Sequence, residues 1–363
     1  MMKGKVFGIR QDEMTSARRL KALLEGKPID RIPITNFGMR EFCALNLGYT
    51  IGDSYMNPEK SIYAQTCTME QYGFQLEPNI AYASYGAWEF GGEIKMPSGE
   101  WEQAPYIKRY PITTEKEVGD LSLPEVTSAG IIPIMMEFSK VAERNGLPVL
   151  PFISPPFSTA GNLCGLEKMA RWMYKAPQVI DNLLQKATDH AVEVVKYWID
   201  TFGAGEVSVR EAAAFEANQI ISPKHFERFV FPYEKELHER ILSLGIKRFF
   251  NCHICGDQRM NLPYWAQVPM GELSLISFDH DTDLEAGIKY FGETCIIAGN
   301  LNTSILQTGT PQKVYEETRQ IIEIGKKAPR GFMLSAGCGL PPNTPPYNVY
   351  MMRKAIDDFG WFD

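Results

Sequence analysis

Runs of apolar residues, six to eight positions long and bounded by turn-forming residues, recur along the whole chain. They alternate with longer segments of helical periodicity. Continuous apolar runs of this length are typical of strands that are buried on both faces of a parallel sheet. The sequence therefore predicts eight strands: Ile32–Phe37, Phe74–Ala81, Val149–Pro155, Glu206–Ala212, Arg248–Ile254, Leu273–Asp279, Cys295–Leu301 and Gly331–Gly337.

The segments between these runs carry the signals of amphipathic helices. From Ile180 to Trp198 apolar residues fall at spacings of three and four, and Gly203 can end this helix. Ser222-Pro223 and Thr310-Pro311 each supply a capping residue followed by a proline at the first helical position. Further helices are predicted over Ser16–Leu24 and Tyr347–Phe359.

Residues 84–147, between the second and third runs, form a stretch that is too long for an ordinary loop. A turn at Pro97-Ser98-Gly99 separates Glu93-Ile94-Lys95 from Trp101-Glu102, which indicates a β-hairpin. A helix is predicted over Ile131–Asn145. No linker-like sequence flanks the stretch, so we expect an insertion inside one domain that spans residues 1–363.

Strands that alternate with helices predict an α/β fold with a parallel sheet. Eight strand–helix units favour a (β/α)8 barrel of the TIM type over an open doubly wound sheet, which usually has five or six strands. The barrel would carry an N-terminal helix and the hairpin-plus-helix insertion. Its active site would form at the mouth, where the C-terminal ends of all strands converge.

Composition excludes several classes of protein. The 363 residues are 44% hydrophobic and carry a net charge of −7, and no basic run is present, so no nucleic-acid partner is expected. The N-terminus lacks a signal sequence and no apolar stretch could span a membrane, which predicts a cytoplasmic protein. Seven widely spaced cysteines favour thiols or metal ligands over disulfides.

The most specific chemical signal lies at the end of the fifth run. Residues two apart on a strand share a face, so His253 and Cys255 point to the same side and Cys252 to the other. Cys338 lies just beyond the eighth run, between Gly337 and Gly339, and therefore reaches the same mouth. Two thiolates and one imidazole suit zinc best, and three protein ligands leave one coordination position open for catalysis.

Other interpretations of these residues remain open from the chain alone. The cysteines could be buried core residues, and Cys252 with Cys255 could be a redox pair, although such a pair normally opens a helix. Further polar residues lie at the ends of other strands. Any of them could be a fourth zinc ligand, a support for the ligands or a substrate contact, or simply structural: Glu211, Asp279, His280 and Asn300.

Three stretches resemble one known family: Asp30-Arg31-Ile32-Pro33; Gly299-Asn300-Leu301-Asn302 with Gly309-Thr310-Pro311; and the run from Gly337 to Pro345, Gly-Cys-Gly-Leu-Pro-Pro-Asn-Thr-Pro. They are similar to the uroporphyrinogen decarboxylase superfamily, and the resemblance covers nearly the whole chain from about residue 14. It implies a TIM-barrel fold, in agreement with the eight runs.

Two branches of this superfamily have to be separated. The decarboxylases carry several arginines in an N-terminal loop and a histidine at the position of Cys338, whereas this sequence has only Arg40 in that loop. Zinc methyltransferases of corrinoid-dependent systems, among them methylcobalamin:coenzyme M methyltransferases, have a His-x-Cys pattern and a distant cysteine. His253, Cys255 and Cys338 match this pattern, so the resemblance implies a zinc site.

The resemblance implies methyl transfer between a corrinoid and a thiol such as coenzyme M, activated as a zinc thiolate. Substrate contacts are assigned to Glu211, Asp279, Asn300 and Arg40. The chain has no Asp-x-His-x-x-Gly cobalamin motif, so methylcobalamin or another corrinoid is expected on a partner protein. The alternatives are transfer from a methyl ether, methylamine or methanol to the corrinoid protein, uroporphyrinogen decarboxylation, and a non-catalytic module with a structural zinc, for which His280 is the best-placed fourth ligand.

Overall fold

The computed structural model describes residues 5–6, 9–10, 12–35, 38–98, 102 and 104–362. Its centre is a six-stranded sheet in the order β10-β9-β8-β7-β6-β5, in which all neighbouring strands are parallel. The strands are β5 (Phe152–Ile153), β6 (Val209–Ala213), β7 (Phe249–Ile254), β8 (Leu275–Phe278), β9 (Ile296–Leu301) and β10 (Phe332–Ala336). Nearly every residue in them is buried, as continuous apolar runs predict. Six of the eight predicted strands are thus confirmed.

The first two predicted strands are wrong as regular strands. Within 32–35 only an isolated bridge joins Ile34 to Leu334 of β10, and the segment 74–81 has no strand residues. Pro33 and Pro78 lack an N–H group for a sheet ladder, which explains the irregularity. Asn36 and Phe37, at the end of the first predicted strand, lie outside the described residues.

Both irregular segments nevertheless line the same interior as the sheet. The amide of Gln75 donates to the carbonyl of Ile34 at 2.8 Å. Inside, the Glu77 carboxylate accepts hydrogen bonds from Thr35 and from Arg210 of β6, the latter at 2.5 Å, and all three side chains are buried. The α/β barrel class predicted from the sequence is therefore confirmed, with six regular strands and two irregular segments around one interior.

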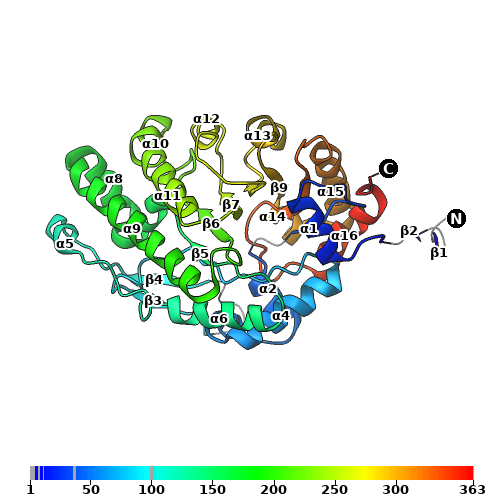
Figure 1. Ribbon diagram of the computed structural model, residues 1–363, viewed down its shortest axis with the longest axis horizontal. Helices are drawn as coiled ribbons and strands as arrows, with labels where there is room; N and C mark the ends of the chain where they lie inside the picture. Colours follow the sequence, from blue (N-terminus) through cyan, green and yellow to red (C-terminus); the bar gives the residue numbers. More distant parts are fainter. Residues whose placement is uncertain are drawn as a thin grey trace.

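Helices surround the strands, and Figure 1 shows α9, α11, α13 and α15 on the outside of the sheet. Several begin and end as predicted: Ser222 and Thr310 cap α10 and α15, and Gly203, with φ of +86°, ends α9. The helices are α1 (Ser16–Leu24), α2 (Arg40–Asn46), α3 (Ile51–Met56), α4 (Pro58–Tyr72), α5 (Glu115–Asp120), α6 (Ile132–Arg144), α7 (Pro156–Cys164), α8 (Leu166–Lys175), α9 (Pro177–Phe202), α10 (Pro223–Phe229), α11 (Phe231–Ser243), α12 (Leu262–Trp265), α13 (Leu284–Phe291), α14 (Thr303–Thr308), α15 (Pro311–Gly325) and α16 (Pro346–Phe359). None of the described helices is both long and apolar enough to cross a lipid bilayer.

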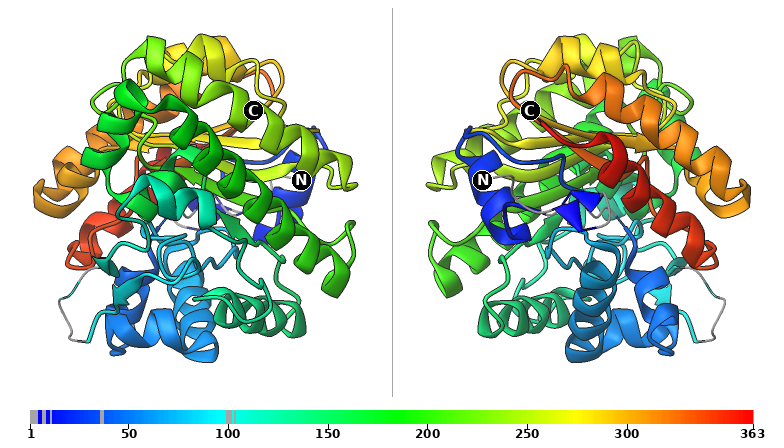
Figure 2. Two further views of the ribbon diagram at one scale, coloured as in Figure 1. Left: turned by 90° about the vertical axis from the view of Figure 1, so that its left-hand side faces the viewer. Right: turned by 90° about the vertical axis from the view of Figure 1, so that its right-hand side faces the viewer.

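The stretch 84–147 contains the predicted hairpin and helix. β3 (Glu93–Lys95) pairs with β4 (Tyr106–Arg109) in antiparallel orientation, so the second strand begins later than the predicted Trp101-Glu102. Gly99 and Trp101 themselves lie outside the described residues. Helix α6 packs beside α4 on one side of the sheet, as Figure 2 shows.

The two ends of the chain lie on the same side of the molecule. β1 (Lys5–Val6) pairs with β2 (Ile9–Arg10), and Arg10 donates to the carbonyl of Phe362 at 3.3 Å. Behind them the guanidinium of Arg19 forms a buried ion pair with Asp30 at 2.6 Å. This pair fixes α1 to the segment that leads into the barrel interior.

Candidate active site

Strand β7 presents His253 on its inner face and ends one residue before Cys255. The amide of Cys255 donates to the carbonyl of Ala213 at 3.0 Å, so the chain continues in strand-like pairing past the end of β7. Ala212 and Ala214 of the neighbouring strand end line the same cavity as Cys255. Small side chains at these two positions leave the cysteine sulfur accessible from the mouth.

Cys338 reaches this place because Gly38 allows the loop after β10 to approach the N-terminal segment closely. Gly38 has a φ of +64°, and a Cβ atom there would lie 2.8 Å from the Cα of Gly339. The amide of Leu340 donates to the carbonyl of Gly38 at 2.9 Å. A larger residue at Gly38 would therefore push the loop that carries Cys338 away from the mouth, whereas a Cβ atom at Gly339 would lie at an ordinary contact distance, 3.6 Å from the Gly38 carbonyl oxygen.

The structure brings the three residues predicted as metal ligands together. One ligand atom each of His253, Cys255 and Cys338 lie within 4.8 Å of one another, and the two sulfurs are 3.9 Å apart. The imidazole is fully buried and the two thiols are half-buried. Within the described part of the chain, this group has no fourth His, Cys, Asp or Glu. The arrangement can hold a metal ion by three ligands and leave one position facing the cavity.

Hydrogen bonds orient the imidazole toward the sulfurs. His253 Nδ1 lies 2.9 Å from the hydroxyl of Ser277, whose proton goes to the Asn251 side-chain oxygen at 2.8 Å. The Ser277 oxygen thus accepts from Nδ1, and Nε2 is left to face the thiols. His253 also hydrogen-bonds Cys338. These two hydrogen bonds, from His253 to Ser277 and from Ser277 to Asn251, fix both the tautomer and the plane of the imidazole ring.

The hydrogen bond between the two thiols shifts their pKa values in opposite directions. A hydrogen bond from Cys255, together with His253, holds the pKa of Cys338 well below its usual range. The same hydrogen bond, with burial, raises the pKa of Cys255. The shift favours the thiolate form of Cys338, which is the form that binds metal ions.

The sulfurs form one wall of a cavity of about 210 Å³. This volume is below the 300–1,000 Å³ typical of sites for drug-sized ligands, so the cavity suits a small molecule. Its lining mixes apolar surface with a few polar groups: Gly38, Arg40, Glu41, Tyr55, Asn79, Ala81, Tyr82, Ala83, Ala104, Phe152, Ser154, Ala212, Ala214, Cys255, Cys338 and Gly339.

Arg40 supplies a positive charge in the wall of this cavity. Its guanidinium lies 3.7 Å above the Tyr55 ring and donates to the carbonyl of Ala81 at 2.7 Å. The nearest carboxylate, Glu41, is 3.4 Å away and also accepts a hydrogen bond from the Tyr55 hydroxyl. The Nε and Nη1 atoms of Arg40 have no hydrogen-bond partner among the described residues. The cation is thus held in place with donor capacity left over.

The other residues predicted at the mouth hold loops rather than line the cavity. Asp279 accepts from the amides of Gly256, at 3.2 Å, and His280, at 2.6 Å. The His280 ring is bound to Asp279 at 2.5 Å and lies 3.6 Å from Asp281, so neither ring nitrogen faces the sulfurs. Asn300 donates to the carbonyls of Asp279 and Thr282. None of these side chains is among the described residues that line the cavity.

Glu211 was predicted at the mouth, but its side chain lies on the opposite face of the sheet. Because Ala212 and Ala214 point into the cavity, strand alternation turns Glu211 outward. There its carboxylate contacts His238 of α11 at 2.8 Å and Cys252 at 3.5 Å. Cys252 and Cys255 therefore belong to different faces of the sheet, which disfavours a redox pair. All seven cysteines are free thiols.

Sequence reasoning did not identify several functional neighbours. Ser277 and Asn251 orient His253, and Tyr55 and Asn79 shape the cavity around Arg40. Ser277 lies on β8 directly opposite His253 in the strand register, so it could be found only once strand pairing is known. No sequence motif marks Tyr55 or Asn79.

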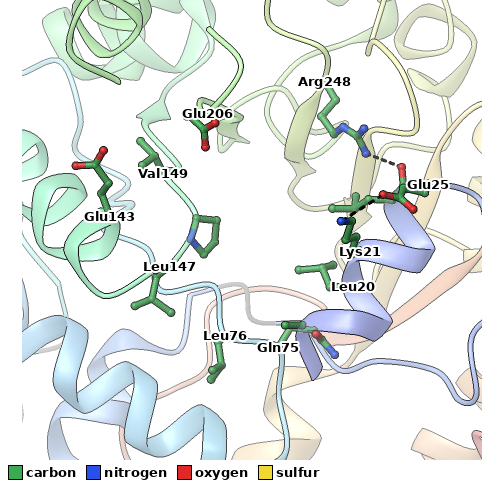
Figure 3. Close-up of a pocket in the computed structure, with 14 residues that line it drawn as sticks. Leu20, Lys21, Glu25, Gln75, Leu76, Glu143, Leu147, Val149, Glu206 and Arg248 are labelled. Atoms are coloured by element: carbon green, nitrogen blue, oxygen red, sulfur yellow. Dashed lines mark hydrogen bonds and ion pairs between the residues drawn. The ribbon is translucent and has the colours of Figure 1, made fainter. Parts of the chain in front are cut away.

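A second, larger hollow lies at the other end of the strands. Figure 3 shows it between α1, α6 and the start of β7, lined among others by Leu20, Leu147 and Arg248. Arg248 donates to the carbonyl of Leu24 at 2.9 Å. The described lining residues include no cysteine or histidine, so this hollow lacks the groups that the strand C-terminal ends provide.

Comparison with known proteins places the chain among related sequences. The family model described as uroporphyrinogen decarboxylase (URO-D) matches residues 15–359. A methylated-thiol–coenzyme M methyltransferase of Methanosarcina mazei is 26% identical, over 95% of this chain and 90% of that protein. A methylcobamide:CoM methyltransferase (MtbA) of Methanosarcina acetivorans is 23% identical, over 96% of this chain and 99% of that protein.

A solved structure shares the fold. A methyltransferase from Methanosarcina mazei superposes with a TM-score of 0.79 at 22% sequence identity. The match covers 96% of this chain and 99% of the other.

Proposed function

The chain belongs to the uroporphyrinogen decarboxylase (URO-D) family, and from this we propose that it is a methyltransferase that moves a methyl group between a corrinoid and a small thiol. The whole chain would act as one barrel domain. The observation that carries the proposal is the group His253, Cys255 and Cys338 at the wall of a small cavity. Relatives of matching length are named methylcobamide:CoM and methylated-thiol–coenzyme M methyltransferases.

The donor set suits zinc. Two sulfurs and one imidazole nitrogen are the soft and borderline ligands that zinc prefers, and three ligands correspond to a catalytic rather than a structural site. A structural zinc would need a fourth protein ligand, and both nitrogens of His280 are engaged with Asp279 and Asp281. These contacts favour an enzyme over a non-catalytic binding module.

The proposed chemistry divides between the metal and the protein. When bound, zinc supplies a Lewis acid that favours the deprotonated form of a substrate thiol at neutral pH. Cys255 and Cys338 would keep the site rich in negative charge, which preserves the nucleophilicity of a thiolate. Ser277 holds the His253 ring so that Nε2 stays available. The alanines at 212 and 214 leave room for the substrate beside the sulfurs.

Arg40 would select the class of thiol. Its guanidinium lies in the wall of the same cavity as the two sulfurs, with nitrogen atoms that no described protein group accepts from. A short thiol that also carries an anionic group, such as the sulfonate of coenzyme M, would satisfy both ends of the cavity. Asp279 and Asn300 hold the loops around the site and are proposed as supports, not as substrate contacts.

Porphyrinogen decarboxylation is disfavoured by size and charge. A cavity of about 210 Å³ is too small for a tetrapyrrole, and the described lining residues include one arginine for a substrate with many carboxylates. The corrinoid, which is also a tetrapyrrole, would remain outside the cavity on a partner protein docked over the mouth. Only its methyl group has to reach the thiol.

A second candidate runs the reaction in the opposite direction, from a methyl donor such as a methyl ether, methylamine or methanol to the corrinoid. Tyr82 lines the cavity and could contact an aromatic donor, whereas Tyr85 and Phe90 pack against His190 instead. The deciding experiment offers the purified, zinc-loaded protein methylcobalamin with a panel of thiols. Parallel reactions offer cob(I)alamin with methyl donors, and the cobalt spectrum is followed in both.

Arg40→Met sharpens this experiment. We expect KM for an anionic thiol to rise roughly 10–100-fold, because a charge-assisted contact is lost, while KM for a neutral thiol of equal length changes little. Turnover with methyl donors and none with any thiol would replace the first candidate by the second. Equal losses for anionic and neutral thiols would remove Arg40 from substrate recognition.

A further inference from the structure

A second group of potential ligands lies between the sheet and α11, on the face opposite the mouth. Glu211 of β6, Cys252 of β7 and His238 of α11 each place one ligand atom within 4.8 Å of the others. His238 Nε2 is 2.8 Å from Glu211 Oε2, and Cys252 Sγ is 3.5 Å from the same oxygen. Glu234, one turn before His238, places Oε1 3.4 Å from Nε2. All four side chains are at most 1% exposed.

The orientation of His238 is that of a ligand. Its Nδ1 lies 2.8 Å from the carbonyl oxygen of Pro269, which can only accept, so Nδ1 carries a proton. The Phe249 ring stacks on the imidazole at 3.8 Å with an interplanar angle of 8°. Metal-binding histidines are typically held in this way, with one nitrogen fixed by a carbonyl and the other turned to the ion. Nε2 points into the group of carboxylates and thiol.

The carboxylates have acceptor capacity that the protein does not fill. Within the described residues, Glu211 Oε1 and Glu234 Oε2 are buried without a hydrogen-bond partner, and Glu234 Oε1 has only the His238 ring, at 3.4 Å. Leaving a buried carboxylate oxygen without a donor is costly, and each is in a place that water cannot reach. A cation at the centre of the group would be coordinated by these oxygens and would replace the missing hydrogen-bond donors.

We propose that Glu211, His238 and Cys252, with Glu234 as the fourth ligand, form a second metal site for a divalent ion of the zinc class. Tetrahedral zinc with bonds of roughly 2.0–2.3 Å places its ligands about 3.2–3.8 Å apart. Here His238 Nε2 lies 2.8 Å from Glu211 and 3.4 Å from Glu234, and Cys252 Sγ lies 3.5 Å from Glu211. An ion therefore needs only a small expansion of the group.

The site is closed and therefore structural. It joins β6 and β7 to α11 (Figure 1), and nothing in it faces the cavity at the mouth. Cys252 and His253 are adjacent in sequence but on opposite faces of β7, so two ions would be bound on the two sides of one strand. Metal content can thus be tested without any measurement of methyl transfer, and the outcome is independent of the proposed function.

The test counts metal per chain after incubation with Zn²⁺ and removal of the excess. We expect about two equivalents in the unaltered protein. About one should remain in Cys255→Ala/Cys338→Ala, which removes the ligands at the mouth, and none when His238→Gln is added. If the mouth double variant folds and holds no zinc, no second site exists, whatever the unaltered protein binds.

Cobalt identifies the ligand and covers the case in which His238→Gln fails to fold. In Cys255→Ala/Cys338→Ala, Co²⁺ should produce a thiolate-to-cobalt charge-transfer band from Cys252. Adding Cys252→Ser should abolish the band, whereas Cys295→Ser, another buried cysteine, should leave it. Persistence of the band without Cys252, or its absence in the double variant, would overturn the assignment. Circular dichroism verifies that each variant is folded.

Discussion

Cys252 and His253 are neighbours on one strand, yet they serve regions of opposite character. His253 joins Cys255 and Cys338 beside a cavity that small molecules can enter. Cys252 joins Glu211 and His238 in a group sealed between the sheet and α11. The alternation of side chains along β7 thus separates the proposed catalytic site from the proposed structural site. The types of ligand do not by themselves distinguish the two groups. What distinguishes them is whether small molecules can reach the ligands.

The strongest test of this comparison replaces, in separate variants, two cysteines that lie three residues apart. Cys255→Ser should lower methyl transfer by about 10³–10⁴-fold, because roughly 4–5 kcal/mol of transition-state stabilisation depends on an intact metal site. Cys252→Ser should leave kcat per folded molecule unchanged within about threefold and reduce the free energy of unfolding by roughly 1–3 kcal/mol. Steady-state kinetics and urea unfolding measure both quantities.

The matched pair is informative because both variants make the same chemical change. If Cys252→Ser lost activity as severely as Cys255→Ser while still folded, the two faces would not be functionally separate. A loss of stability without a loss of activity in Cys255→Ser would show that the mouth is also structural.

The interior region should respond most strongly to the loss of one charged partner. Glu211→Gln leaves His238 buried without its nearest carboxylate, at 2.8 Å in the native protein. Breaking a buried pair in this way should destabilise the protein by about 3–4 kcal/mol. Glu206→Gln, on the exposed stretch before β6, is the control and should change the free energy of unfolding by less than about 0.5 kcal/mol.

Equal unfolding midpoints for Glu211→Gln and Glu206→Gln would mean that the interior group contributes little to stability. In that case the distinction drawn between the two regions would have to rest on the mouth alone.

Much of this comparison could be predicted from the sequence. The placements that could not be predicted have physical reasons. Period-two alternation was enough to group His253 with Cys255 and to set Cys252 apart. It failed for Glu211, because the inward positions of β6 are fixed by where the strand begins, and the apolar run did not reveal that boundary. His238 was out of reach, since the face that α11 turns to the sheet depends on helix docking. The prolines at 33 and 78 disrupted two strands whose apolar pattern was otherwise regular.

A pH titration tests a buried carboxyl group that lies between the two regions. Glu216 is fully buried beyond the end of β6, where it accepts from the hydroxyl and amide of Ser158 and from the amide of Phe215. Burial raises its pKa from 4.5 to about 7. A raised folded pKa means that this contribution to stability is fully present below pH 4.5 and is lost as the pH rises through 7. The loss should be roughly 2–3 kcal/mol.

The control for this titration is Glu216→Gln, which cannot ionise. Its free energy of unfolding should fall less than that of the unaltered protein between pH 4.5 and 7.5. Parallel pH profiles for the two proteins would show that Glu216 keeps an ordinary pKa and plays no part in the pH response.

The smallest effect is expected from removing the hydrogen bond that supports His253 at the mouth. Ser277→Ala removes the acceptor for His253 Nδ1–H, at 2.9 Å, but none of the three proposed ligands. Losing such a support typically costs 10–100-fold in metal affinity, and we expect about tenfold, the lower limit, because the packed strands still confine the ring. Competition with a zinc chelator measures this change. Ser274→Ala, on the preceding segment, should have no effect on it. An unchanged affinity in Ser277→Ala would mean that the barrel interior alone positions His253, and that packing rather than hydrogen bonding fixes the geometry of the mouth.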